Sequence, residues 1–272
     1  MHRLSHVCPK SRFLFCMSII YLFAFSSLYI QLPVPKDGAD FLHNPSILRF
    51  SELFGLNTYY MMELLIILGV LLSFMAFFSE SFRTMTVYFA LWIFYLSVFK
   101  AGQVFLWFQW DILLLEAGAL TVLLAGVDMI IFRFPSYTAS DGISLWLIRW
   151  LLFRLMFASG VVKLTSKCPL WWGLSALDWH FQSQCIPTPA AYYFHYLPKW
   201  LLHLAVAVTL ILEIIFPFLF FLPLRGIRIF SFYSQIMLQL LIIITGNYNF
   251  FNLLTIVLCY SLLTDYEFPL TL

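Results

Sequence analysis

Two cysteines lie in the longest stretch of the second half of the chain that is not strongly apolar: Cys168 and Cys185. A disulfide between them would close a loop of about 17 residues and would contribute about 3 kcal/mol in the chain-entropy model. The alternative is a redox-active pair that acts on the thiols of other proteins. No CxxC motif supports that alternative, so we expect a structural disulfide, which requires an oxidising compartment.

Ionisable and amide side chains inside apolar segments form a second candidate group. Its members are Lys100, Asp111, Glu116, Arg149, Arg154, Glu213, Asn247 and Asn249. A bare charge at the centre of a bilayer costs at least about 2.5 kcal/mol, so such groups pair with one another or line a wet cavity. We favour internal pairs that fix helix packing. A polar site for a lipid, an ion or an enzyme substrate is the alternative.

Aromatic side chains surround the two cysteines and form a third candidate group. This group contains Trp171, Trp172, Trp179, His180, Tyr192 and Tyr193. Aromatic residues at a water interface usually anchor a protein to the membrane surface. A catalytic histidine needs an acid or a nucleophile within hydrogen-bond reach, and Asp178 two residues before His180 is weak evidence for one. We therefore expect membrane anchoring or contact with a partner, and no catalytic residue.

Motifs for metal, cofactor or nucleic-acid binding do not occur in the sequence. It has no HExxH motif and no Cys/His cluster with the spacing of metal ligands. The formal net charge is only +2, and the basic residues are scattered through apolar segments rather than forming a stripe. We expect neither a metal ion nor a cofactor, and no nucleic-acid partner.

The composition indicates that these side chains are positioned by membrane helices. Of the 272 residues, 62% are hydrophobic and only 10% are charged, whereas soluble domains carry about 25% charged residues. Too few polar groups remain to cover a water-facing surface. A lipid bilayer is therefore the expected solvent, and bundled helices are the simplest structure that satisfies the backbone there.

Eight apolar runs predict an all-α, multi-pass bundle that forms a single membrane domain over residues 1–272. The runs are 13–32, 59–78, 86–107, 112–132, 145–162, 200–221, 229–245 and 250–263. The first could instead be a cleaved signal peptide. We favour a membrane helix, because about 20 apolar residues are long for a signal sequence and sufficient to cross the hydrocarbon. Pro217 is expected to kink the sixth run.

Charge asymmetry predicts which loops share a side of the membrane. Basic residues precede the first run, which favours a cytosolic N-terminus by the positive-inside tendency. Alternation then places the loops over about 33–58 and 163–198 on the far side. That side would be the lumen, where Cys168 and Cys185 could pair.

Four long blocks resemble the lipase maturation factor family. They are FSELFGLNTYYMMELL (50–65), GQVFLWFQWDILLLEAG (102–118), RWLLFRLMFASGVVKLTSKCPLWWGLSALDWHFQSQCIPTPAA (149–191) and LIIITGNYNFFNLLT (241–255). The resemblance implies a multi-pass membrane protein of the endoplasmic reticulum that assists the folding and export of secreted lipases such as lipoprotein lipase. It also implies that the 163–198 region faces the lumen and takes part in client maturation. It supplies no catalytic residues.

The resemblance also predicts what is missing from this chain. Family members continue through a further hydrophobic segment into a large lumenal domain, so we expect a shortened form that lacks this C-terminal domain. The expected partners are secreted lipases during folding and the lipids of the reticulum membrane. Two other functions stay open: a membrane-embedded enzyme that acts on a lipid or a protein side chain through the intramembrane charges, and a membrane scaffold.

Overall fold

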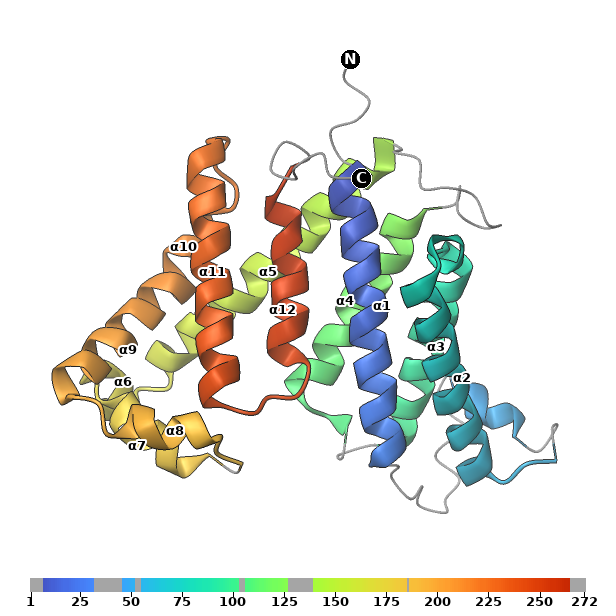
Figure 1. Ribbon diagram of the computed structural model, residues 1–272, viewed down its shortest axis with the longest axis horizontal. Helices are drawn as coiled ribbons and strands as arrows, with labels where there is room; N and C mark the ends of the chain where they lie inside the picture. The colour runs from blue at the N-terminus through green and yellow to red at the C-terminus, as the bar shows by residue number, and fades with distance from the viewer. Residues whose placement is uncertain are drawn as a thin grey trace. The chain divides into compact units, whose positions relative to one another are not determined.

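The computed structural model describes residues 7–31, 46–51, 55–102, 106–126, 139–184 and 186–264, and within these ranges the chain forms helices and no strand (Figure 1). The predicted all-α fold is therefore confirmed. The helices group into two compact units, one up to Leu145 and one from Trp146 to Glu267. The single membrane domain expected from the sequence stays a prediction.

The described residues of unit 1 form four long helices, two short 3-10 turns and the start of a further helix. Its elements are α1 (Val7–Ile30), η2 (Ile47–Phe50), α2 (Thr58–Phe78), η4 (Glu80–Phe82), α3 (Met85–Gly102), α4 (Gln109–Ala125) and the first residues of α5 (Ala139–Thr165). Its core is formed by apolar and tyrosine side chains from all four long helices. Tyrosine hydroxyls join the helices inside it. Tyr88 of α3 donates to the Leu14 carbonyl oxygen of α1 at 2.6 Å.

Helix α1 supplies a large share of that core. Phe13, Met17, Tyr21 and Phe25 recur at helical spacing along one face, and none of them is exposed to solvent. The ring of Phe25 lies so close to Gly69 of α2 that a Cβ atom there would approach it to 2.6 Å. The first run thus forms a helix that is long and apolar enough to cross a membrane, and its retention in the mature protein stays a prediction.

Unit 2 contains the remainder of α5 and all later helices. These are α6 (Pro169–Trp172), α7 (Ala176–Ser183), α8 (Pro189–His195), α9 (Lys199–Ile214), α10 (Phe216–Leu219), α11 (Arg225–Thr245), α12 (Phe251–Cys259) and η7 (Tyr260–Leu262). Aromatic rings join α5 to α10. The Phe153 ring centroid lies 5.3 Å from that of Phe218, and Phe157 and Phe218 are also 5.3 Å apart.

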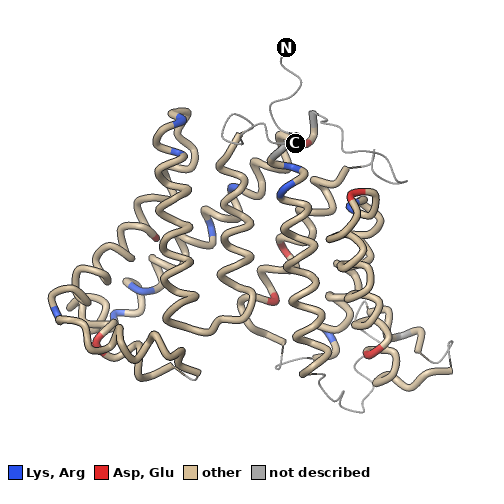
Figure 2. Tube along the Cα trace, viewed as in Figure 1, with Lys and Arg blue, Asp and Glu red and all other residues tan. Residues whose placement is uncertain are grey.

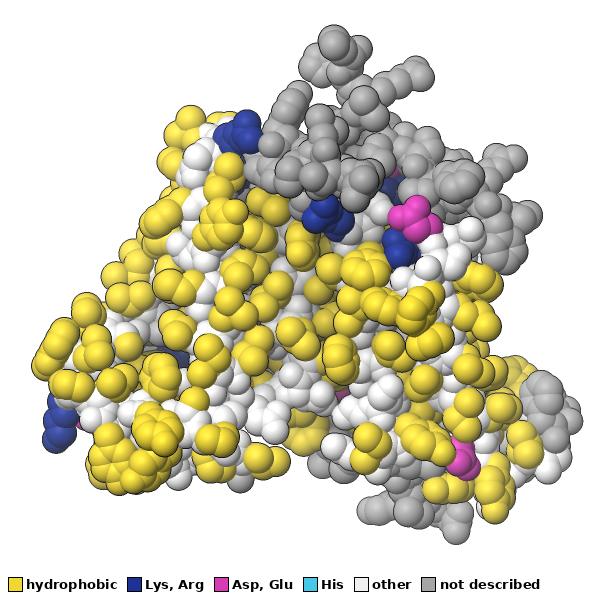
Figure 3. Space-filling view, viewed as in Figure 1, with side chains coloured by type: hydrophobic (Ala, Val, Ile, Leu, Met, Phe, Trp, Pro, Cys, Tyr) yellow, Lys and Arg dark blue, Asp and Glu magenta, His cyan; other side chains and the backbone are white. Residues whose placement is uncertain are grey.

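Helix α11 shows that this unit is built for a bilayer, because its polar residues point inward. Ser231, Gln235 and Gln239 are buried, whereas Phe230, Tyr233, Met237 and Ile244 are exposed. This pattern is the reverse of a soluble helix and matches a lipid-facing one. Apolar side chains likewise cover most of the surface drawn in Figure 3, and charged residues are sparse along the chain trace in Figure 2.

Five described helices are long and apolar enough to cross a membrane. They are Pro9–Ile30, Thr58–Phe78, Met85–Gly102, Ser140–Thr165 and Arg225–Thr245. Helices α8 and α9 meet at 112° and together have the length and composition of a sixth, broken span. Helix α4 and the segment Phe251–Leu262 are shorter. Each of the eight predicted apolar runs thus corresponds to a helix.

Several predicted boundaries differ from the structure. Helix α4 begins at Gln109, within the gap of 108–111 left between the third and fourth predicted runs, and α5 begins at Ala139 rather than Leu145. Pro217 does more than kink the sixth run, because α9 ends at Ile214 and a separate helix, α10, follows. The segment expected as a loop over 163–198 contains three short helices.

Several parts of the predicted topology lie wholly or partly outside the described residues, among them residues 103–105 at the end of the third run. The predicted loop 33–58 is described only at residues 46–51 and from residue 55 onward. The first of these stretches contains the short helix η2. The end of the fourth run, after residue 126, is also outside. Within unit 2, α6–α8 and the α11–α12 turn lie at the same end (Figure 1). The assignment of that end to the lumen stays a prediction.

Candidate functional site

The segment between α5 and α9 is organised around a small core of its own. Phe181 of α7, Ala191 of α8 and Leu202 of α9 are buried against one another, with Leu177, Phe194 and Leu197 packed around them. Local sequence explains the helix starts. Pro169 occupies the first turn of α6, and the Thr188 hydroxyl caps α8 by accepting from the Ala191 N–H at 3.3 Å.

Side-chain hydrogen bonds attach this segment to the long helices of unit 2. The Thr188 hydroxyl donates to the Ile244 carbonyl oxygen near the end of α11 at 2.7 Å. The Trp172 indole N–H donates to the Leu164 carbonyl oxygen of α5 at 3.1 Å. These contacts place α6–α8 at a fixed position against the ends of α5 and α11.

Six large aromatic side chains point outward from this segment and from the start of α9. We call them the aromatic face: Trp172, Trp179, Tyr192, Tyr193, Tyr196 and Trp200, with exposed fractions of 57–73%. Four of them belong to the group expected from the sequence. Tyr196 and Trp200 were missed, although their aromatic type and their position before an apolar run are typical of interfacial residues.

Trp171 and His180, also expected in this group, are less exposed than the aromatic face. The Lys163 Nζ lies 5.3 Å from the centroid of the Trp171 ring, within the range of a cation–π interaction. The His180 Nε2 lies 3.5 Å from the Tyr248 hydroxyl. Burial, with a smaller effect of the Lys163 charge, lowers the pKa of His180 below its ordinary value of 6.5.

Asp178 does not form a pair with His180. Its carboxylate lies 3.4 Å from the His203 Nε2 of α9, and this contact joins α7 to α9. The arrangement serves packing of the small core. Among the described residues, His180 therefore has no carboxylate partner of the kind that general acid–base catalysis requires.

The expected intramembrane polar residues are distributed between the two units. In unit 2, Lys163 of α5 pairs with the buried Glu213 of α9 at 2.5 Å. Arg149 of α5 donates through Nη2 to the Ser261 carbonyl oxygen of η7 at 2.6 Å and through Nε at 3.2 Å. These contacts connect neighbouring helices. Arg154 is exposed on α5.

In unit 1, the buried Asp111 at the start of α4 accepts a hydrogen bond from the Tyr95 hydroxyl of α3. Lys100 lies in the last turn of α3 and Glu116 in α4, and both side chains are partly buried. Over the described ranges, no group of three or more His, Cys, Asp or Glu side chains is placed to hold a metal ion.

The deepest ion pair of unit 1 was missed by sequence reasoning. Lys10 of α1 and Asp141 of α5 are 2% and 0% exposed, and the Lys10 Nζ lies 2.9 Å from both carboxylate oxygens. One feature of the sequence could have indicated this pair, because Lys10 and Asp141 each lie just before an apolar run. Their separation of 131 residues hid the pairing.

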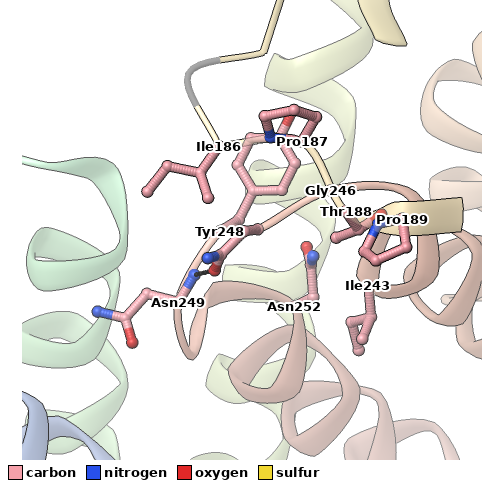
Figure 4. A pocket seen from close by; sticks show the side chains of 10 residues that line it. Ile186, Pro187, Thr188, Pro189, Ile243, Gly246, Tyr248, Asn249 and Asn252 are labelled. Carbon is pink, nitrogen blue, oxygen red and sulfur yellow. Dashed lines mark hydrogen bonds between the residues drawn. The ribbon is translucent and has the colours of Figure 1, made fainter. Parts of the chain in front are cut away.

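Asn247 and Asn249 are exposed on the turn between α11 and α12. The Asn249 N–H donates to the Asn247 Oδ1 at 3.5 Å, shown as a dashed line in Figure 4. Both residues line a cavity within unit 2. The structure therefore places them around a mixed polar and apolar pocket at a helix end and not in the contacts made by Glu213 or Arg149.

Cys168, immediately before α6, has a free and partly exposed thiol in the structure. Cys185 lies outside the described residues. The pairing of these two cysteines therefore stays a prediction.

The fold and the reversed polarity of α11 define a multi-pass helical membrane protein. Residues 8–270 match the family model described as "Lipase maturation factor transmembrane domain". The chain is 53% identical over 96% of its length to lipase maturation factor 2 of Xenopus laevis and 45% identical over 94% to that of Homo sapiens. It is 33% identical over 80% of its length to lipase maturation factor 1 of Homo sapiens. The chain belongs to the lipase maturation factor family.

The match covers only part of these relatives. The chain spans 39% of the length of the Xenopus laevis protein and 40% of the length of the Homo sapiens lipase maturation factor 2. No solved structure is significantly similar to it.

Proposed function

We propose that the chain is a membrane factor of the endoplasmic reticulum that assists the folding, maturation and export of secreted lipases such as lipoprotein lipase. The observation that carries the proposal is the aromatic face on α6–α9, which presents six exposed rings from a segment with its own small core. The names of the relatives, which describe lipase maturation, support the same role.

The aromatic face has the properties of a surface that binds partly folded proteins. Tyrosine and tryptophan offer large contact areas with a polar tip, and they lose little conformational entropy on binding. A folding lipase exposes apolar surface that would otherwise lead to aggregation. Rings held on short helices could cover such surface transiently, in the manner of a chaperone.

Membrane anchoring is the alternative role for the same rings. Anchoring requires only amphipathic rings at the level of the headgroups, so exchange of Trp for Phe or Tyr should preserve it. Client binding depends on the shape of the surface, so removal of the rings should reduce lipase export without changing the amount of protein in the membrane.

The intramembrane charges of unit 2 form contacts between helices, which is consistent with a non-enzymatic role. Glu213 is neutralised by Lys163, and Arg149 is held by a backbone carbonyl. Both contacts join helices within unit 2, so these charges have a packing role that needs no substrate. We accordingly propose secreted lipases and reticulum lipids as the partners.

Rescue of lipase secretion tests this proposal. Cells that lack the endogenous factor would receive the chain or a full-length relative. Each would also be tested as a double variant, Trp172→Ala with Tyr193→Ala in this chain and the corresponding changes in the relative. Lipase activity in the medium is the readout, and membrane abundance of each variant is measured in parallel. The matched control is Phe74→Ala with Phe89→Ala, which removes two exposed rings from α2 and α3.

At equal membrane abundance, we expect the double variant of the aromatic face to restore less lipase secretion than the protein from which it was made. The control double variant should restore as much secretion as the unchanged protein. Rescue by the aromatic-face variant equal to that of its parent would contradict the proposed contact surface.

A further inference from the structure

A cavity of about 370 Å³ opens where the α7–α8 connection meets the α11–α12 turn of unit 2. It is lined by Ile186, Pro187, Thr188, Pro189, Ile243, Gly246, Asn247, Tyr248, Asn249 and Asn252. This volume lies within the range of small-ligand sites, about 300–1,000 Å³. None of the ten lining residues carries a charge.

Asn252 is the residue that points to a ligand. It is only 2% exposed, yet its carboxamide makes no hydrogen bond to any other described residue. Figure 4 shows this carboxamide rising from the first turn of α12 into the cavity, with Tyr248 and Thr188 on either side. A polar group bound in the cavity could therefore use both the donor and the acceptor of this carboxamide.

The walls of the cavity are fixed before any ligand binds. Asn249 adopts a left-handed backbone conformation, with φ of 53°, and its N–H is held by the Asn247 side chain at 3.5 Å. The Tyr248 ring lies over Gly246, where a Cβ atom would approach the ring to 2.6 Å. The Thr188 hydroxyl ties the opposite wall to α11 at 2.7 Å. Preformed walls reduce the entropy lost when a ligand is ordered.

The chemistry of these walls selects a neutral ligand with many hydroxyl groups. The Asn252 carboxamide offers a donor and an acceptor in one plane, which suits a pair of neighbouring hydroxyls, and Asn247 lines the same cavity. The Tyr248 ring and the aliphatic side chains offer apolar surface for C–H groups. A charged ligand would lose its hydration without gaining an opposite charge. We propose that this cavity binds a neutral saccharide unit.

An extended peptide fits the cavity less well. Peptides that bind as an added strand need a row of backbone N–H and C=O groups on the receptor. Pro187 and Pro189 have no N–H, and the Thr188 hydroxyl is already engaged with α11 and α8. Recognition must therefore come from the side-chain amides, which suit a saccharide better than a peptide backbone.

The saccharide could belong to a glycoprotein or to the headgroup of a glycolipid, since both present the same hydroxyl chemistry. The inference goes beyond the proposed role in lipase maturation and does not depend on it, because the cavity is tested with saccharides alone. If no saccharide binds, the proposal for the aromatic face is unaffected. If lipase secretion is not rescued, the proposal for the cavity is unaffected.

A binding measurement on the full chain tests the proposal. The chain would be purified in a detergent without a sugar headgroup and titrated with a fluorescent high-mannose oligosaccharide, with the same glycan bearing sialic acid, and with vesicles containing a neutral glycosylceramide. Asn252→Leu keeps the approximate shape of the side chain and removes its polar atoms. Asn252→Ser removes the carboxamide but keeps a small polar side chain, so it tests the same contact without introducing an apolar group. Asn57→Leu, at an exposed asparagine of unit 1, is the matched control.

We expect saturable binding of the neutral saccharide that weakens about tenfold or more in Asn252→Leu and in Asn252→Ser, and is unchanged in Asn57→Leu. Binding of the free oligosaccharide assigns the cavity to glycoprotein glycans, and binding of the vesicles alone assigns it to glycolipid headgroups. The proposal is overturned if no neutral saccharide binds, if the sialylated glycan binds as tightly, or if the Asn252→Ser variant retains full affinity.

Discussion

Lys163 of α5 and Glu213 of α9 form an ion pair of 2.5 Å in which the carboxylate is almost fully buried. The same lysine lies over the Trp171 ring, near the end of α5 and just before the segment α6–α8 that carries most of the aromatic face. The pair therefore connects the long helices of unit 2 with the segment that we propose as the client surface.

Removal of one partner from this pair should be strongly destabilising. Lys163→Met leaves the Glu213 carboxylate buried without its counter-charge, which costs about 3–5 kcal/mol. The double variant with Glu213→Gln should recover much of that loss. Thermal unfolding in detergent measures both effects, and Lys199→Met, at an exposed lysine, is the control. Equal stability of Lys163→Met and the wild type would refute the structural role.

The Lys10–Asp141 pair should hold α1 against the start of α5 in unit 1. Both side chains are almost completely buried, so Asp141→Asn is expected to lower the free energy of unfolding by about 3 kcal/mol. The exchange variant, with Lys10→Asp and Asp141→Lys, should be more stable than either single change. A double-mutant cycle with no coupling between the two positions would contradict the pairing.

Stability should decrease in mild acid because of His180. Its pKa is lowered in the folded chain, so the unfolded chain binds the proton first, and stability is lost as the pH falls below about 6.5. His180→Gln cannot bind this proton. We expect a smaller drop in melting temperature between pH 7.5 and 5.5 for His180→Gln than for the wild type. Identical drops would show that His180 does not contribute.

The predicted disulfide is tested by alkylation of the chain isolated from cells under non-reducing conditions. If Cys168 and Cys185 are paired in the lumen, both resist alkylation until a reductant is added. Loss of the bond should reduce stability by about 3 kcal/mol. The buried Cys259 should become reactive on unfolding alone, without a reductant. Alkylation of Cys168 in the folded, unreduced chain would refute the pairing.

Sequence reasoning predicted the long helices well, because an uninterrupted apolar run of membrane length leaves few alternatives for the backbone. It failed where structure depends on contacts between distant residues. The fifth run was predicted to begin at residue 145, yet α5 already contains Asp141, whose carboxylate pairs with the distant Lys10.

The segment α6–α8 also shows that tertiary contacts could not be predicted from the sequence. Its three short helices carry little apolar periodicity, and they are stabilised by the small core around Phe181 and Leu202. The sequence identified most of the exposed rings by residue type. It could not show that Trp171 packs beside Lys163 while Trp172 points outward, because that difference depends on tertiary packing.

Site-specific photo-crosslinking from the aromatic face tests the central claim most directly. A photoreactive amino acid would replace Tyr193 or Trp172 in cells that synthesise a secreted lipase, with Phe74 of α2 as the control position. We predict adducts with newly made lipase from Tyr193 and Trp172 and none from Phe74. If neither aromatic-face position captures lipase while its secretion still depends on the chain, the proposed client surface is wrong.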